Sequence, residues 1–246
     1  MRRIAAALLL ASLAAGARAE PPETPPLDAD PFRALAEIKT RDDIWDRSFD
    51  SLYEQMLASF RADPKFVKAD SACPGFVDTI SEAARPFMRD GHFKQREPYR
   101  AGLTRIYRAG LTAAQAREAI DFYQSDDGRY FLELGTDSTS QQAKIEQGGG
   151  PLTRENFDAD LARTREDAVA KADPAIRERA EATLARSSWY DPYVAINPQV
   201  QQLRFEITRM RDPDTLERRK AMDEAIRRAG IQHFANCGKT VPLKTP

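Results

Sequence analysis

Apolar residues recur at helical spacing along most of this 246-residue chain, and pairs of a capping residue and a proline interrupt them. Asp173-Pro174, Asn197-Pro198 and Asp212-Pro213 are such pairs, and each is predicted to begin a helix. In each pair the first side chain can cap the helix and the proline fits its first turn. No stretch shows sustained strand alternation between hairpin turns. The sequence therefore predicts an all-α protein, a multi-helix bundle of antiparallel helical hairpins without a significant sheet.

Two helix boundaries in the C-terminal part follow from the same reasoning. A loop that holds Trp189, Tyr190 and Tyr193 is expected to precede the helix that begins at Asn197-Pro198. The last helix is expected to end at Gly230, because glycine suits the position just after a helix.

The best-defined segment runs from residue 111 to residue 134 and is predicted to be a tight corner between two helices. Thr112 and Gln115 have the spacing of a capping box. Tyr123 lies on the apolar face of the first helix, and Ser125 can cap the second. Gly128 falls in the first turn of that second helix, where it is expected to permit close approach of the preceding one. These roles are structural.

The same corner resembles a known family of exported bacterial proteins. The residues concerned are Leu111-Thr112, Phe122-Tyr123-Gln124-Ser125 and Gly128. They resemble the LT…FYxS-x-x-G pattern of the domain-of-unknown-function family numbered twenty fifty-nine, most closely over residues 99–141. Asp126 stands where that family usually has proline, and Gln115 where an acidic residue is common. The resemblance implies an exported all-α domain without an established activity, so it transfers no catalytic residue.

The N-terminal segment has the organisation of a secretory signal peptide. Arg2 and Arg3 precede an uncharged apolar stretch over residues 4–15, and Ala17 and Ala19 are small residues before a predicted cleavage site at Ala19-Glu20. The apolar stretch is too short to span a membrane. We therefore expect a periplasmic or secreted protein without an integral membrane segment after cleavage.

Composition limits the kinds of partner. Three of the 37 basic residues lie in the signal peptide, so the mature chain has a net charge of about −4. This balance does not match the basic surface that binds nucleic acid. The expected domains are a signal peptide over 1–19, a flexible leader over 20–42, an N-terminal helical unit over 43–147 and a C-terminal helical unit over 148–246. The boundary is placed at Gly148-Gly149-Gly150.

The chain has two cysteines, Cys73 and Cys237. In an exported protein such a pair predicts a disulfide, here one that would couple the two helical units. The alternative is two buried thiols. A metal site is not expected, because the two cysteines and the two histidines, His92 and His233, are far apart in the sequence, and His233 has only Cys237 near it. His92 is expected in a polar loop and His233 on a short C-terminal segment.

The sequence predicts no catalytic residues, no cofactor and no metal. Trp189, Tyr190 and Tyr193 form its most suggestive aromatic cluster. If exposed, they could bind a partner, and if buried, they would join helices. The first hypothesis is a non-enzymatic binding or interaction protein of the bacterial envelope, which uses a groove between the units to hold another envelope protein or a small ligand. The alternatives are a hydrolase-type enzyme without a recognisable motif and a purely structural component.

Overall fold

The computed structural model describes residues 30–139, 152–210 and 214–239. Within these ranges all regular secondary structure is helical, which confirms the predicted all-α class. The helices gather into two compact units. Unit 1 contains the described residues up to 52 and those from 95 to 210, and unit 2 contains residues 53–94 and those from 214 onward. Each unit is therefore built from two separate stretches of the chain.

This division differs from the predicted one. The expected boundary at Gly148-Gly149-Gly150 lies outside the described residues. Residues on both sides of it, in 95–139 and 152–210, belong to unit 1. The expected units over 43–147 and 148–246 are therefore not the compact bodies that the structure forms.

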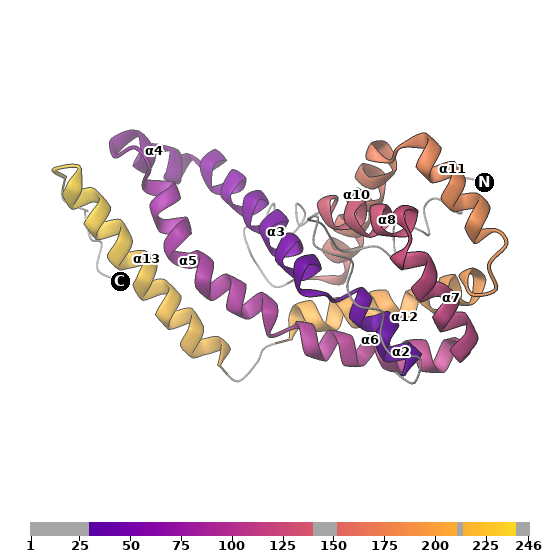
Figure 1. Ribbon diagram of the computed structural model, residues 1–246. Helices are drawn as coiled ribbons and strands as arrows, with labels where there is room; N and C mark the ends of the chain where they lie inside the picture. The colour runs from indigo at the N-terminus through magenta and orange to yellow at the C-terminus, as the bar shows by residue number, and fades with distance from the viewer. Residues whose placement is uncertain (1–29, 140–151, 211–213, 240–246) are drawn as a thin grey trace. The chain divides into compact units, whose positions relative to one another are not determined.

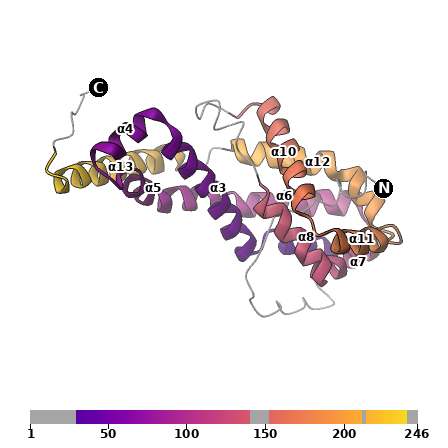
Figure 2. The ribbon, with the colours of Figure 1, turned by 90° about the horizontal axis from the view of Figure 1, so that it is seen from above.

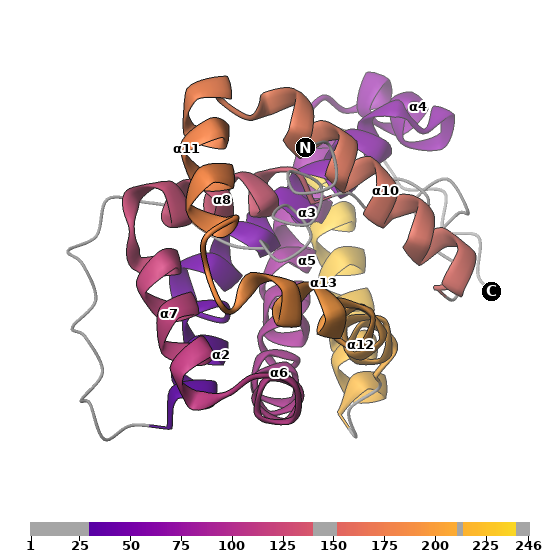
Figure 3. The same cartoon turned by 90° about the vertical axis from the view of Figure 1, so that its right-hand side faces the viewer.

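Unit 1 is a layered arrangement of short and medium helices (Figure 3). Helix α2 packs against α6 and α7, α12 packs along α6, and α8 contacts α7, α10 and α11. The long helix α3 contributes its N-terminal half to this unit. The helices are α2 (Pro31–Ile38), α3 (Asp42–Ala62), α6 (Arg96–Gly110), α7 (Ala113–Gln124), α8 (Asp126–Asp137), α10 (Arg154–Lys171), α11 (Pro174–Leu184) and α12 (Tyr190–Arg209).

Helix α2 corrects the expected leader over 20–42. The Asp30 carboxylate accepts a hydrogen bond from the Phe32 backbone N–H, and Pro31 occupies the first turn. Leu35 and Ala36 are both 0% exposed in the core of unit 1. The segment from residue 30 is thus an ordered part of that core, because the four buried apolar residues of α2 lie in the helix that packs against α6 and α7. Residues 20–29 and the predicted signal peptide lie outside the described residues.

Helix α12 begins earlier than the start expected at Asn197-Pro198. Trp189 lies at its N-cap position, and the helix continues from Tyr190 through Pro198 to Arg209. The predicted loop is therefore the first turn of this helix. Proline inside a helix removes one hydrogen bond, but Ile196 and Val200 on either side of it are buried in the core, and this burial compensates for the loss.

Unit 2 is a smaller helical body. Helices α5 and α13 lie side by side along their lengths (Figures 1 and 2), and α4 contacts the beginning of α5. Val77, Ile80 and Ala84 are buried on α5. The helices of this unit are α4 (Pro64–Ala72), α5 (Phe76–Phe93), α13 (Thr215–Asn236) and the C-terminal part of α3.

The last helix does not end at Gly230. Helix α13 continues for six residues beyond Gly230 to Asn236, and Gly230 is the one residue of this helix that is fully buried. A Cβ atom at this position would lie 3.3 Å from the ring of Phe76, so glycine is used here for close packing of α13 on α5. His92, expected in a loop, lies in the last turn of α5. No described helix is long and apolar enough to cross a membrane.

Candidate functional site

The aromatic residues proposed for binding lie inside unit 1. Trp189, Tyr190 and Tyr193 are 1%, 7% and 4% exposed. The Trp189 ring lies 5.3 Å from that of Tyr193 and 5.7 Å from that of Tyr123, measured between centroids. These three residues therefore present no exposed aromatic surface to a partner. They join α12 to α7, which is the alternative role considered for them.

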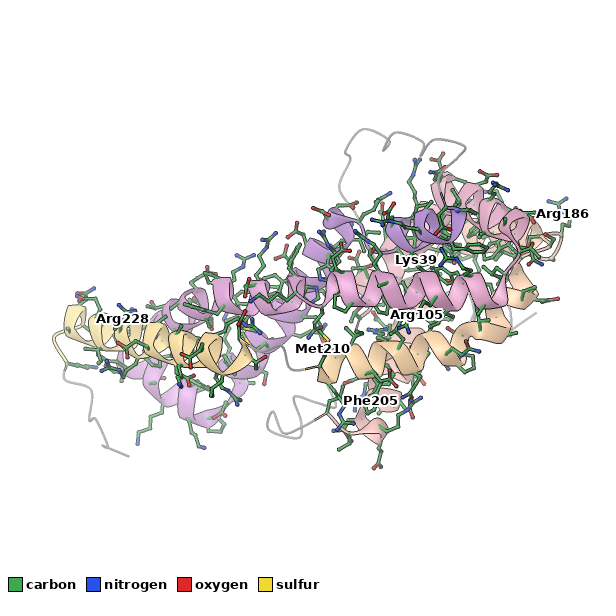
Figure 4. All side chains as sticks on the ribbon, turned by 90° about the horizontal axis from the view of Figure 1, so that it is seen from below. Lys39, Arg105, Arg186, Phe205, Met210 and Arg228 are labelled. Carbon is green, nitrogen blue, oxygen red and sulfur yellow. A yellow bond between two sulfur atoms is a disulfide. The ribbon has the colours of Figure 1, made fainter. Side chains whose placement is uncertain are left out.

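A lysine that sequence reasoning missed completes this aromatic cluster. Lys39 follows α2 (Figure 4) and is 6% exposed. Its Nζ atom lies 3.9 Å from the centroid of the Tyr123 ring and 5.3 Å from that of Tyr193. Loss of hydration lowers the pKa of Lys39 well below its ordinary value. Burial likewise raises the pKa of Tyr107 and Tyr193 well above 10.

The helix corner has the structure that its sequence predicts. The Gln115 backbone N–H donates to Thr112 Oγ1 at 3.2 Å, and the Thr112 backbone N–H donates to Gln115 Oε1 at 2.8 Å. The Gly128 backbone N–H donates to Ser125 Oγ at 3.2 Å. Phe122 and Tyr123 are both buried. These residues shape the core of unit 1.

The predicted disulfide between Cys73 and Cys237 is present, with the two Cα atoms 6.0 Å apart. It joins the connection between α4 and α5 to the end of α13. Both cysteines belong to unit 2. The bond therefore closes this unit on itself and does not couple two sequential halves of the chain as expected.

His233 lies beside this disulfide. Its Nδ1 atom is 2.9 Å from Thr79 Oγ1, and its Nε2 atom is 3.3 Å from the carbonyl oxygen of Cys73 and 3.1 Å from that of Pro74. One ring nitrogen and the sulfur atoms of Cys73 and Cys237 all lie within 4.8 Å of one another. The Cys73–His233–Cys237 cluster is the one group of three such potential metal ligands found among the described residues.

The members of this cluster come from two distant parts of the sequence. His233, expected on a short terminal segment, lies on the long helix α13. Cys73 is 160 positions away in the chain, so no local motif includes it. The available signal was the four-residue spacing of His233 and Cys237, which places both side chains on one face of a helix.

Acidic side chains that lie close together on the helices of unit 1 form ion pairs with arginines or are buried. Asp158 forms an ion pair with Arg154 at 3.0 Å, and Asp160 on the same helix is buried. Asp127, in the first turn of α8, pairs with Arg179 at 2.7 Å. These acids stabilise helices and helix contacts.

Comparison of the chain with protein-family models, with curated proteins and with solved structures finds no match. The resemblance of residues 99–141 to the exported family stays a prediction.

Proposed function

We propose that this protein is an exported, non-enzymatic binding protein of the bacterial envelope, and that helix α4 forms part of its binding surface. The proposed partner is another envelope protein that presents an apolar segment flanked by acidic residues. The signal-peptide pattern over residues 1–19 supports export. The disulfide supports an oxidising compartment, because such bonds persist mainly outside the cytoplasm.

The proposal rests on helix α4, which contains no buried residue although it includes large apolar side chains. Val67 is 45% exposed. The neighbouring Phe66 is half-buried and lies 4.9 Å from the ring of Phe60, measured between centroids. Apolar side chains that stay accessible next to one another are typical of interaction sites.

The polar residues around this surface indicate the chemistry of the partner. Lys65 and Lys68 are exposed on either side of Phe66 and Val67. The surface thus has apolar side chains at its centre and ammonium groups at its edge. A partner with an apolar segment and acidic residues beside it would match this arrangement, because complementary charges speed association and select the partner.

Photocrosslinking tests the proposal. A photoreactive amino acid is introduced at Val67 and, as a control, at the exposed Arg228 on α13, and each purified mature protein is irradiated in an envelope extract of the producing bacterium. We expect an adduct of defined mass at position 67 and none at position 228. An excess of the unmodified protein should suppress the adduct, whereas an excess of Val67→Glu should not.

Val67→Glu is a suitable competitor because Val67 is exposed. The substitution should leave the core unchanged, so the variant should unfold at the same temperature as the original chain. Equal labelling at both positions, no adduct at position 67, or full competition by Val67→Glu would contradict the proposed surface.

A further inference from the structure

We infer that reduction of the Cys73–Cys237 disulfide converts this end of unit 2 into a zinc site, in which the two cysteine thiolates and the imidazole of His233 bind the ion. The same residues would then hold unit 2 together in two ways. The oxidised form has a covalent bond, and the reduced form would have a metal bridge.

The positions of the three side chains support this site. Their potential ligand atoms already lie within 4.8 Å of one another. His233 and Cys237 are one helical turn apart at the end of α13, and Cys73 approaches from the connection before α5. Zinc binds thiolate sulfur at about 2.3 Å and imidazole nitrogen at about 2.0–2.1 Å. Small side-chain movements would reach these distances once the sulfur atoms separate.

The surroundings of the cluster hold its two sides together without the disulfide. Cys73 Sγ lies 3.5 Å from the carbonyl oxygen of His233. The Lys239 ammonium group donates to the carbonyl oxygen of Ala72. The Phe76 ring packs 4.9 Å from that of Phe234, measured between centroids. The ends of α13 and α4 are therefore adjacent through contacts that reduction leaves in place.

The hydrogen bonds of His233 match those of a metal ligand. One ring nitrogen of such a histidine usually donates to a carbonyl or carboxylate oxygen, which orients the ring. The carbonyl groups of Cys73 and Pro74 and the hydroxyl of Thr79 surround this imidazole. Binding would exchange one of these contacts for a bond to zinc, while the others keep the ring oriented.

Two thiolates and one imidazole leave a fourth coordination position. Structural zinc sites usually have four protein ligands, whereas three protein ligands leave room for water or another small ligand. Sulfur and nitrogen ligands favour zinc over magnesium and calcium, which prefer oxygen. We therefore assign the site to zinc with a water molecule as the fourth ligand.

Access to the disulfide is asymmetric, because Cys237 is exposed and Cys73 is 0% exposed. A dithiol reductant would attack the Cys237 sulfur as a thiolate, and Cys73 would leave as a thiolate. The second thiol of the reductant would then displace Cys237. The reductant becomes a disulfide, and the protein gains two electrons and two protons. Zinc binding then releases the two thiol protons.

Zinc titration tests the inference. The mature full-length protein is reduced with a dithiol, freed of it under anaerobic conditions, and titrated with Zn²⁺ in competition with a chromogenic chelator. We expect one equivalent to bind the reduced protein and none to bind the oxidised protein. Co²⁺ should give thiolate-to-metal charge-transfer absorption. His233→Ala should weaken binding more than about 100-fold, which exceeds the loss expected when a residue that only hydrogen-bonds to a metal ligand is removed.

His92→Ala is the matched control, because it removes the other histidine, and it should bind zinc like the original chain. His233→Gln preserves hydrogen bonding at position 233 and should also lose affinity, which separates ligation from misfolding. The inference is overturned if the reduced protein binds no zinc, if His233→Gln keeps full affinity, or if α13 loses its structure on reduction and zinc does not restore it.

Discussion

Lys39 makes the stability of unit 1 depend on pH through one side chain. Its ammonium group is exposed to water in the unfolded chain but enclosed by aromatic rings in the native unit. Burial lowers its pKa in the folded state, so the unfolded chain binds more protons between that lowered value and about 10.5. The free energy of unfolding therefore rises with pH across this window.

We expect Lys39→Met to remove this dependence, because methionine fills a similar volume without a charge. The variant should be more stable than the original protein at pH 7. Its advantage should shrink by about 1.4 kcal/mol per pH unit between the lowered pKa and 10.5. Urea unfolding at pH 7 and pH 9.5, followed by the signals of the buried aromatic residues, measures the difference. The exposed Lys171→Met serves as control, and a constant difference between Lys39→Met and the original protein would contradict the explanation.

Trp189 shows what sequence reasoning could and could not establish about single residues. The sequence offers both an exposed and a buried role for this residue, but its burial depends on the rings of Phe122 and Tyr123, which come from α7. Helical periodicity identifies which residues share a face. It does not identify which distant element covers that face.

Gly128 sets the angle between α7 and α8. A Cβ atom there would overlap the carbonyl group of Phe122 and lie 2.8 Å from Tyr123 Cα. These are backbone atoms, so they cannot move away as the end of a side chain can. We expect Gly128→Ala to lower the free energy of unfolding by about 1–3 kcal/mol, despite the higher helix propensity of alanine. Urea unfolding of the purified variant measures this loss.

Gly91 on α5 provides the matched control. A Cβ atom there would meet the guanidinium of Arg218 at 3.3 Å, and this flexible group can shift. Gly91→Ala should therefore be neutral or stabilise the protein by up to about 1 kcal/mol. A Gly128→Ala variant as stable as Gly91→Ala would show that the corner tolerates a side chain.

The ends of several helices followed from local chemistry, and the errors had physical causes outside it. Asp63, Thr112, Ser125 and Asp173 cap helices through their own side chains, so their roles can be seen in short stretches of sequence. Gly230 looked like a helix end, but tertiary packing against Phe76 uses it inside α13. Glycine serves both purposes, and only the neighbouring helix decides between them.

At the scale of the whole molecule, the division into units could not be predicted from a sequential boundary. Unit 2 combines residues 53–94 with residues near the C-terminus, and the stretch from 95 to 210 belongs to unit 1. Composition and glycine content report where the chain turns, but not which distant helices pack together. The cysteine pair was the one long-range signal in the sequence, and it correctly linked Cys73 to Cys237.

This disulfide closes a loop with a sequence separation of 164 residues. A loop of this size corresponds to about 5 kcal/mol of stabilisation in the chain-entropy model, and native disulfides typically contribute about 2–5 kcal/mol. We expect the double variant Cys73→Ser/Cys237→Ser to lose stability within that range. The loss should concentrate in unit 2, because both ends of the bond lie there. Helix α13 also buries few side chains, since Gly230 is the one residue of this helix that is fully buried, so it depends more strongly on the covalent bond.

Hydrogen exchange measured by mass spectrometry distinguishes a local from a global effect. In the double serine variant, amide protection should fall in α5 and α13 and stay unchanged in α7 and α8, whose contacts lie within unit 1. The original protein after reduction should show the same pattern, which separates loss of the bond from the effect of serine. An equal loss of protection in all four helices would mean that the bond stabilises the chain as one cooperative body, contrary to the division into two units.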